Sequence, residues 1–367
     1  MFARLLVPKE HSLKLFQRNL RLFSSKTCPH TGFTADAEKA SNAQIIDGRK
    51  ISNKIKSLLK KEIRYLRDTF APSHSSRPKL GYVIVGDKPD SYLYVKMKKK
   101  VCKQVGIDTI GRNFNESCSQ WEIEEYVKEL NSDPSVSGIL VQLPLPEKFN
   151  STQICDLVSH EKDVDGIHPL NMGAMARHEE PFFTPCTPKG IICLIKSVCP
   201  VIKGKKATVI GRSNIVGMPI SLLLQKEFAT VTLCHTYTQN LKDEISTADI
   251  VVSATGCPYL VEGNFIKRGA IVIDVGTQFI EDQSRKSGKR LVGDINFQSV
   301  KTQAGYVTPV PGGVGPMTIS MLMDNLVLAW KRSNFKHAKE EIEALEASKR
   351  EFMFSGSISM DHNNFLE

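Results

Sequence analysis

Short apolar runs that alternate with helical segments constrain the fold of this chain more than any other feature. Residues 79–85 and 138–143 are apolar runs bounded by glycine or proline, and each predicts a buried strand. Residues 47–68 carry one apolar stripe at helical spacing, and residues 91–105 follow the first strand, so both predict helices. Because strands that alternate with helices pair in parallel, the sequence predicts an α/β fold with helices on both faces of a parallel sheet.

A second unit begins after the proline-rich segment 181–188 and repeats the alternation. Its expected elements are strands at 207–211, 230–234, 249–254 and 270–275 and a helix at 216–227. This order is typical of a Rossmann-type nucleotide-binding domain. An apolar helix, expected at 318–330, is long enough to pack back on the first unit.

The expected domain boundaries follow from these elements. The first domain covers residues 35–185 and is completed by the helix at 318–332, and the Rossmann-type domain covers residues 186–317. Residues 333–350 are rich in charge and predict an exposed helical extension, and a loose tail follows within residues 333–367.

Composition limits the classes of protein. Of 367 residues, 41% are hydrophobic, which is enough for a large core, and no apolar run approaches the roughly 18–20 residues that span a bilayer. Half of the net charge of +10 lies in the first 35 residues, which carry six basic side chains and one acidic one. The remaining excess is mild, so we expect no nucleic-acid or membrane partner. The nine cysteines form no C-x-x-C pair, which argues against a zinc knuckle, and their odd number argues against a disulfide framework.

The N-terminal segment predicts an import signal. Residues 1–34 are basic and nearly free of acid, and Leu13, Phe16, Leu20 and Phe23 recur at helical spacing. This pattern is typical of a mitochondrial transit peptide, so we expect a protein of the mitochondrial matrix. A basic tail without a targeting function is the alternative.

A glycine turn follows the strand at 207–210. Gly211 and Gly217 bracket this turn, which lets the backbone approach a phosphate at the start of the next helix. The spacing is G-x5-G and not G-x-G-x-x-G, so an ordinary strand–helix turn stays open as an alternative. No acidic residue closely follows the next strand, where an NAD site grips the ribose, whereas Arg212 and Thr236 suit a 2′-phosphate. The sequence therefore favours NADP over NAD.

Polar residues near the ends of the first unit's elements are candidates for chemistry. Tyr94 and Lys98 share one helical face, where a hydroxyl tunes an amine toward proton transfer; a solvated lysine-rich face is the alternative. Gln142 interrupts an apolar strand at its carboxyl end, where ligands bind in α/β sheets, or it is a satisfied core amide. Residues 162–166 place two carboxylates on a loop or simple turn, and residues 308–318 combine prolines and glycines that admit a close ligand.

Together these segments closely resemble the methylenetetrahydrofolate dehydrogenase/cyclohydrolase family. They follow the order of that family over roughly residues 44–332, and each alone is a modest signal, but the ordered set is specific. The matching segments are Tyr94-x-x-x-Lys98, 138–146, 162–166, 185–190, 211–219, 292–294 and 309–318.

The resemblance, which is to the mitochondrial bifunctional form, implies two domains around a cleft and two reactions. The first oxidises 5,10-methylenetetrahydrofolate to the 5,10-methenyl form with NADP or NAD, and the second hydrolyses that product to 10-formyltetrahydrofolate. It further implies a homodimer formed through the nucleotide-binding domain, and we expect no tightly bound metal. A monofunctional dehydrogenase of the same fold and a non-catalytic basic binding protein are the alternatives.

The resemblance also implies functions for individual residues. Lys98 matches the general acid/base, Tyr94 its partner, and Gln142 the residue that positions the lysine and the substrate. Asp165 matches the carboxylate that anchors the pterin ring. Further substrate contacts are implied for Val141, Leu143, Pro311, Gly312 and Gly313. Cofactor contacts are implied for Gly211, Arg212, Ser213, Thr236 and Thr277.

Overall fold

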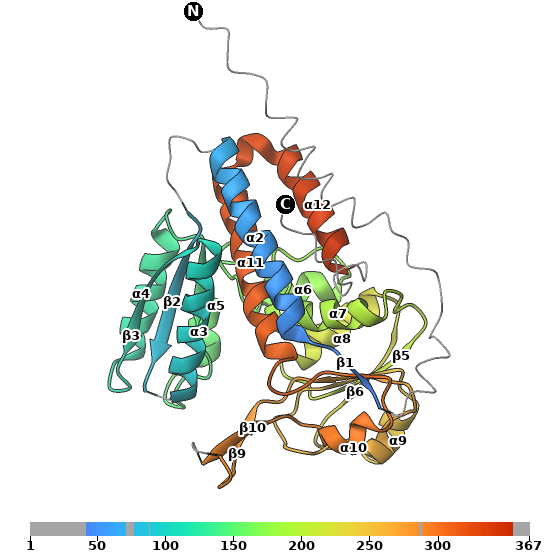
Figure 1. Ribbon diagram of the computed structural model, residues 1–367. Coiled ribbons are helices and arrows are strands. Elements are labelled where there is room, and N and C mark those ends of the chain that lie inside the picture. Colours follow the sequence, from blue (N-terminus) through green and yellow to red (C-terminus); the bar gives the residue numbers. More distant parts are fainter. Residues whose placement is uncertain (1–41, 71–76, 88, 286–287, 355–367) are drawn as a thin grey trace, which may run out of the picture.

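The computed structural model describes residues 42–70, 77–87, 89–285 and 288–354. The expected transit peptide and the expected tail after residue 354 lie outside these residues. Figure 1 shows two α/β units on either side of a pair of long helices that lie side by side. The predicted fold class, α/β with a Rossmann-type second unit, is confirmed by the two parallel sheets.

The first unit is a three-stranded parallel sheet in the order β3-β2-β4. Its strands are β2 (Lys79–Val85), β3 (Asp108–Phe114) and β4 (Gly138–Val141), and its helices are α3 (Pro89–Val105), α4 (Gln120–Ser132) and α5 (Ser151–Asp156). Alternate residues of β2 face different cores: Leu80 and Ile84 pack with α2 (Gly48–Phe70) and α3, whereas Val83 and Val85 pack with α4. Because both faces are buried, the strand reads as a continuous apolar run.

The second unit is a six-stranded parallel sheet in the order β1-β11-β8-β7-β5-β6. Its strands are β1 (Gln44–Ile45), β5 (Lys206–Ile210), β6 (Thr230–Cys234), β7 (Ile250–Ser253), β8 (Ile271–Asp274) and β11 (Tyr306–Val307). Its helices are α7 (Cys186–Val198), α8 (Gly217–Lys226), α9 (Leu241–Ser246) and α10 (Phe297–Lys301). A hairpin of β9 (Gln278–Glu281) and β10 (Lys289–Val292) projects below this sheet, and α6 (Pro169–Ala176) lies between the units (Figure 1).

The α11 helix (Val314–Asn334) joins the two units, because it packs against α2 on one side and against α7 on another. It begins four residues before the expected start at residue 318. Pro316 falls in its first turn, where backbone N–H groups need no intrahelical acceptor, so the proline does not delay the helix. Met321, Leu322 and Leu326 are at most 1% exposed, as expected for a helix covered on several sides.

The prediction that the helical extension after α11 is exposed is wrong. The segment does form a helix, α12 (Lys339–Phe354), but Leu345, Phe352 and Met353 are buried and the helix contacts α7. Lys349 is buried as well, because its ammonium pairs with carboxylates on α2 and α11. Such pairing cannot be read from the local charge pattern, which is that of a solvated helix.

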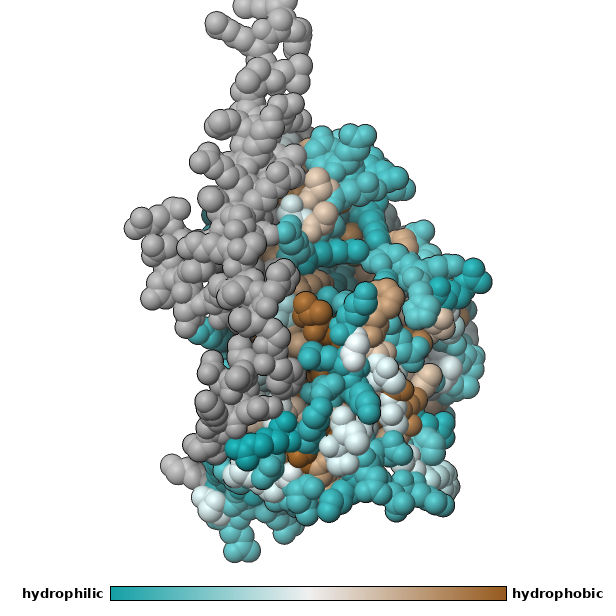
Figure 2. Space-filling view, turned by 90° about the vertical axis from the view of Figure 1, so that its right-hand side faces the viewer, coloured by the Kyte–Doolittle hydropathy of each residue, from teal (hydrophilic) through white to brown (hydrophobic). Residues whose placement is uncertain are grey.

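The face of the molecule in Figure 2 is mostly hydrophilic, with hydrophobic side chains scattered among the hydrophilic ones. None of the helices in the described residues combines the length and the apolar character that crossing a membrane requires.

The N-terminus of α2 lies so close to the loop before α11 that it tolerates only glycine. A side chain on Gly48 would collide with the carbonyl of Gly313. We therefore expect Gly48→Ala to lower the free energy of unfolding by about 2 kcal/mol, since overpacking forces the backbone apart. Urea unfolding measures this change.

Gly173→Ala is the matched control. Gly173 lies in the middle of α6 with open space around it, so alanine should be neutral or should stabilise by about 0.5–1 kcal/mol. Equal unfolding midpoints for the two variants would contradict the close approach of α2 to the loop.

Candidate active site

A buried lysine lies where α3 meets the end of β4 in the first unit. Lys98 is 6% exposed, and its Nζ donates a hydrogen bond to Gln142 Oε1 at 3.1 Å. The same Nζ lies 5.3 Å from the centroid of the Tyr94 ring, one helical turn earlier on α3. The structure therefore brings together the three residues that were predicted as a group, and the alternative of a fully solvated lysine face does not hold for Lys98.

The surroundings shift the pKa values of Lys98 and Tyr94. Burial lowers the pKa of Lys98, while the negative charge of Asp165 opposes that shift. Burial and the charge of Asp165 both raise the pKa of Tyr94. Lys98 therefore has a larger neutral fraction near pH 7 than a solvated lysine, and the Tyr94 hydroxyl stays protonated.

Gln142 directly follows β4, which ends at Val141 and not at residue 143 as expected. Pro144 has no backbone N–H to donate to a neighbouring strand, so the strand stops before it. The Gln142 backbone N–H still donates to Val83 O at 2.9 Å, and its side-chain Nε2 donates to Leu143 O at 2.6 Å. These bonds leave Oε1 aimed at Lys98, so the amide is both a satisfied group and part of the site.

The two carboxylates of the loop at 162–166 have different surroundings. Asp163 is buried and accepts hydrogen bonds from His168 N at 2.7 Å and Asn171 Nδ2 at 3.0 Å, so it stabilises the loop. In the part of the chain that the structure describes, no group donates to the carboxylate of Asp165. Burial raises the pKa of Asp165 to about 6 against the opposing charge of Lys98. Asp165 is therefore the carboxylate that is available to a ligand.

The proline- and glycine-rich loop before α11 borders the same region. Gly312 has φ +121°, and its carbonyl accepts from Arg49 N at 3.0 Å. Gly313 N donates to Pro309 O at 2.8 Å, which closes the turn. A side chain at Gly315, in the first turn of α11 directly after this loop, would lie 3.9 Å from the Tyr94 hydroxyl oxygen, so the start of α11 reaches the Lys98 site.

The predicted glycine turn leads from β5 into α8 and stays open to solvent. Gly211 has φ +104°, a conformation that side chains disfavour, and a side chain there would also collide with the carbonyl of Ala254. Ser213 Oγ accepts from Val216 N at 3.2 Å and Gly217 N at 3.4 Å. Ser213 itself is exposed just before α8, near the positive end of the helix dipole, which favours an anion.

The sheet register brings the other predicted cofactor residues to one edge. Because Ile210 pairs with Cys234, the exposed Arg212 and Thr236 lie two residues beyond the paired ends of β5 and β6. Thr277 lies exposed after β8, on the same carboxyl edge. In open parallel sheets this edge is where nucleotides bind.

Two buried aspartates support this edge, and the sequence analysis gave them no function. Asp294 is fully buried and accepts from Thr255 N at 2.7 Å, while Asp274 accepts from Gly276 N at 3.1 Å and Asp294 N at 2.9 Å. Burial raises the pKa of Asp274 to about 7, with the charge of Asp294 adding to that rise. Gly276 and Gly293 were the available signal, because a side chain on either would collide with these carboxylates.

The described residues contain no candidate metal site. Among the residues with described positions, no group of three or more His, Cys, Asp or Glu side chains could hold a metal ion. The cysteines of these residues are free thiols, and burial raises the pKa of Cys186, beside Asp165, well above its ordinary value.

A nucleotide-binding sheet that faces a unit with a buried lysine defines a two-domain NAD(P)-dependent α/β enzyme. Residues 46–165 match the family model described as Tetrahydrofolate dehydrogenase/cyclohydrolase, catalytic domain. Residues 185–334 match the companion model, Tetrahydrofolate dehydrogenase/cyclohydrolase, NAD(P)-binding domain. The chain belongs to the tetrahydrofolate dehydrogenase/cyclohydrolase family.

Individual relatives agree with this assignment. Bifunctional protein FolD 2 of Arabidopsis thaliana is 49% identical over 291 residues, which cover 79% of this chain and 96% of the relative. Bifunctional protein FolD 1, mitochondrial, of Arabidopsis thaliana is 45% identical over 296 residues, covering 80% and 83%. The Trypanosoma brucei methylenetetrahydrofolate dehydrogenase-cyclohydrolase, solved with NADP and an inhibitor, is 38% identical with a TM-score of 0.77, covering 80% and 99%. The predicted enzyme class, its two activities and the NAD(P) cofactor are confirmed.

Proposed function

We propose that the site around Lys98 carries out both reactions of the family on the one-carbon unit of tetrahydrofolate. The observation that carries the proposal is the buried Lys98 amine, which Gln142 holds at 3.1 Å and whose pKa is lowered by burial. Asp165, with a carboxylate free to accept hydrogen bonds, anchors the N–H groups of the pterin ring. Val141, Leu143 and the loop of Pro311, Gly312 and Gly313 line the substrate.

The oxidation depends on orientation. NAD(P)+ bound at the carboxyl edge of the second sheet accepts the hydride that leaves the methylene carbon. Gly211, Arg212, Ser213, Thr236 and Thr277 hold this cofactor at that edge. The residues of the first unit fix the folate, since bringing the two reacting atoms into register supplies most of the rate enhancement of such a step.

The hydrolysis depends on proton transfer. Water attacks the cationic methenyl carbon, and the neutral amine of Lys98 accepts a proton from that water. The ammonium then returns that proton to the ring nitrogen when the carbon–nitrogen bond breaks, and the remaining hydroxyl proton is released to solvent as the C=O of the 10-formyl product forms. Gln142 fixes the amine, and Tyr94 remains protonated beside it.

Removing the amine separates the two activities. We expect Lys98→Ala to reduce the hydrolysis of methenyltetrahydrofolate by about 100-fold or more, the usual effect of losing a general acid/base. The dehydrogenase rate should fall less, since hydride transfer does not need this proton. The loss of the methenyl chromophore and the gain of reduced nicotinamide, followed together, measure both rates.

Lys100→Ala is the matched control, because Lys100 is an exposed lysine on the same helix. It should retain both rates. Near-normal hydrolysis by the Lys98→Ala enzyme would exclude the lysine from the proposed function.

We infer that the cofactor preference is for NADP. Arg212 and Thr236 are exposed at adjacent strand ends, where a guanidinium and a hydroxyl can hold a 2′-phosphate. Arg212→Ala should raise the KM for NADP by about tenfold, as expected for loss of a charge-assisted hydrogen bond, and should leave the KM for NAD unchanged. The KM for NAD is thus an internal control, and an equal effect on both cofactors would contradict 2′-phosphate recognition.

We propose that the protein acts in the mitochondrial matrix. Residues 1–34 support this proposal through their basic, acid-poor and amphipathic pattern, and one relative with 45% identity is named as mitochondrial. Import of the chain with and without these residues into isolated mitochondria tests it. Import without them would refute their function as the signal.

We also propose a homodimer formed through the second unit. β6 is the edge strand of its sheet, and edge strands present unpaired backbone groups to a partner. Phe228 and Tyr237, which flank this strand, are 71% and 86% exposed. Sedimentation of the purified protein should give twice the mass of one chain, and a monomer at micromolar concentration would contradict the proposal.

A further inference from the structure

A single buried amide holds both ends of the segment that connects the two units. Asn325 of α11 is fully buried, and its Nδ2 donates to Val164 O and to Thr184 O, each at 2.9 Å. Val164 immediately precedes Asp165, and Cys186 N donates to Asp165 O at 3.1 Å. The amide therefore ties the backbone on both sides of the connecting segment to α11, right beside the carboxylate that faces Lys98.

A chain of charged side chains orients this amide. Lys189 Nζ donates to Asn325 Oδ1 at 2.9 Å and to Asp324 Oδ2 at 2.5 Å. Lys349 Nζ, from α12, lies 2.7 Å from Asp324 Oδ1. Burial raises the pKa of Asp324, but the charges of Lys189 and Lys349 outweigh it and hold that pKa well below its ordinary value. The carboxylate is therefore charged near neutral pH and stays an ion-pair partner of both lysines.

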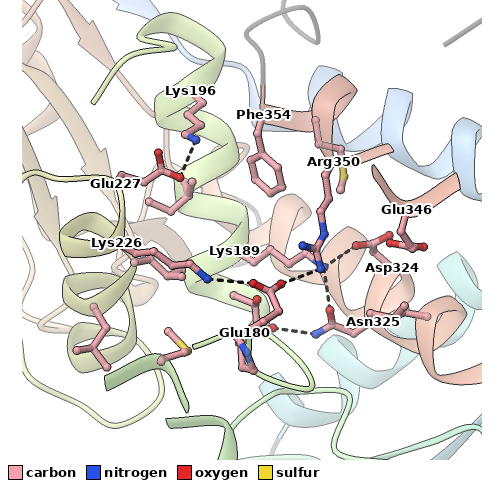
Figure 3. Close-up of a pocket in the computed structure, with 18 of the residues that line it drawn as sticks. Glu180, Lys189, Lys196, Lys226, Glu227, Asp324, Asn325, Glu346, Arg350 and Phe354 are labelled. Atoms are coloured by element: carbon pink, nitrogen blue, oxygen red, sulfur yellow. Dashed lines mark hydrogen bonds and ion pairs between the residues drawn. The ribbon is translucent and has the colours of Figure 1, made fainter. Parts of the chain in front are cut away.

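Lys349, the last residue in this series of contacts, lies outside the region that matches the family. The match ends at residue 334, whereas α12 covers Lys339–Phe354. Figure 3 shows Lys189, Asp324 and Asn325 converging beneath α12, with Arg350 directed toward Glu180. A cavity of about 230 Å³ between α7, α8, α11 and α12 borders them. Its other charged side chains also have ion-pair partners, as in the contact of Lys196 with Glu227, so the described residues that line the cavity offer no unpaired charge to a ligand.

We propose that Asn325 is a positioning residue for Asp165, and that α12 supports it through Lys349, Asp324 and Lys189. In this arrangement α12 stabilises the position of Asp165 in the folate-binding part of the site. The inference rests on the proposed function, because it takes Asp165 as the anchor of the pterin ring. The cofactor edge of the second sheet takes no part in it.

The first variant breaks the contact directly. Asn325→Ala should raise the KM for methylenetetrahydrofolate by about tenfold, since small displacements of an anchoring group are costly, while the KM for NADP stays within about twofold. A merely structural function would lower the melting temperature without this split between the two KM values. A folded Asn325→Ala enzyme with an unchanged folate KM would overturn the proposal.

The second variant acts from α12 and keeps the test valid if the first protein does not fold. Lys349→Met should raise the folate KM by about threefold, with the KM for NADP unchanged. Arg350→Met is the matched control: Arg350 pairs with Glu180 at 2.7 Å from the next position of the same helix, without contacting Asp324. It should leave the folate KM unchanged, and equal effects of the two variants would refute the route through Lys349.

Asp165→Asn separates this inference from the proposed function. If Asp165→Asn leaves the folate KM unchanged, the anchor itself is wrong and the inference falls with it. If Asp165→Asn raises that KM but Asn325→Ala does not, only the positioning proposal fails. The double variant should bind folate no worse than Asp165→Asn alone, because both changes act through one carboxylate, and additive losses would contradict the proposal.

Discussion

The α11 helix is apolar around most of its circumference, and such a helix is stable only where other elements cover every side. α2 and α7, which come from different units, supply that cover. Burial of each large apolar side chain, such as Met321 or Leu326, stabilises the structure by about 1.5–3 kcal/mol, so separating α11 from either partner is costly. The packing that buries α11 therefore also fixes the two sheets relative to each other.

Polar residues on α11 fix the position of the helix along its axis, which the apolar contacts alone do not determine. Apolar packing tolerates small shifts along a helix, whereas a buried charge or amide without a partner costs several kcal/mol. Asp324, Asn325 and Lys331 each find partners on other elements, and Lys331 pairs with Glu62 of α2 and Glu346 of α12. These pairs set the register of α11 against its neighbours, and the first turn of the helix is thereby brought near Tyr94.

The sequence allowed most elements to be predicted, because parallel strands buried on both faces read as apolar runs; β6 was predicted without error and β7 and β8 within one residue at each end. Tyr94, Lys98 and Gln142 were predicted as a group through the resemblance. Spacing alone places Tyr94 near Lys98 on one helix but cannot bring in Gln142, which follows a strand elsewhere in the chain. The burial of α12 was missed for the same physical reason. Its partners lie far away in the chain, and only the folded structure shows that its charges are paired.

Two reactions at one carbon place a stricter demand on the link between units than either reaction alone. In the proposed mechanism, the hydride must reach a cofactor at the edge of the second sheet, whereas Lys98 of α3, in the first unit, activates the water. A connecting segment free to move would let one geometry improve at the expense of the other, because a displacement of about 1 Å already slows such steps strongly. The amide of Asn325 binds Val164 and Thr184 at the two ends of that segment, next to Asp165, the proposed anchor of the substrate. In the proposed arrangement this contact both stabilises the interface between the units and keeps one substrate position for the two reactions.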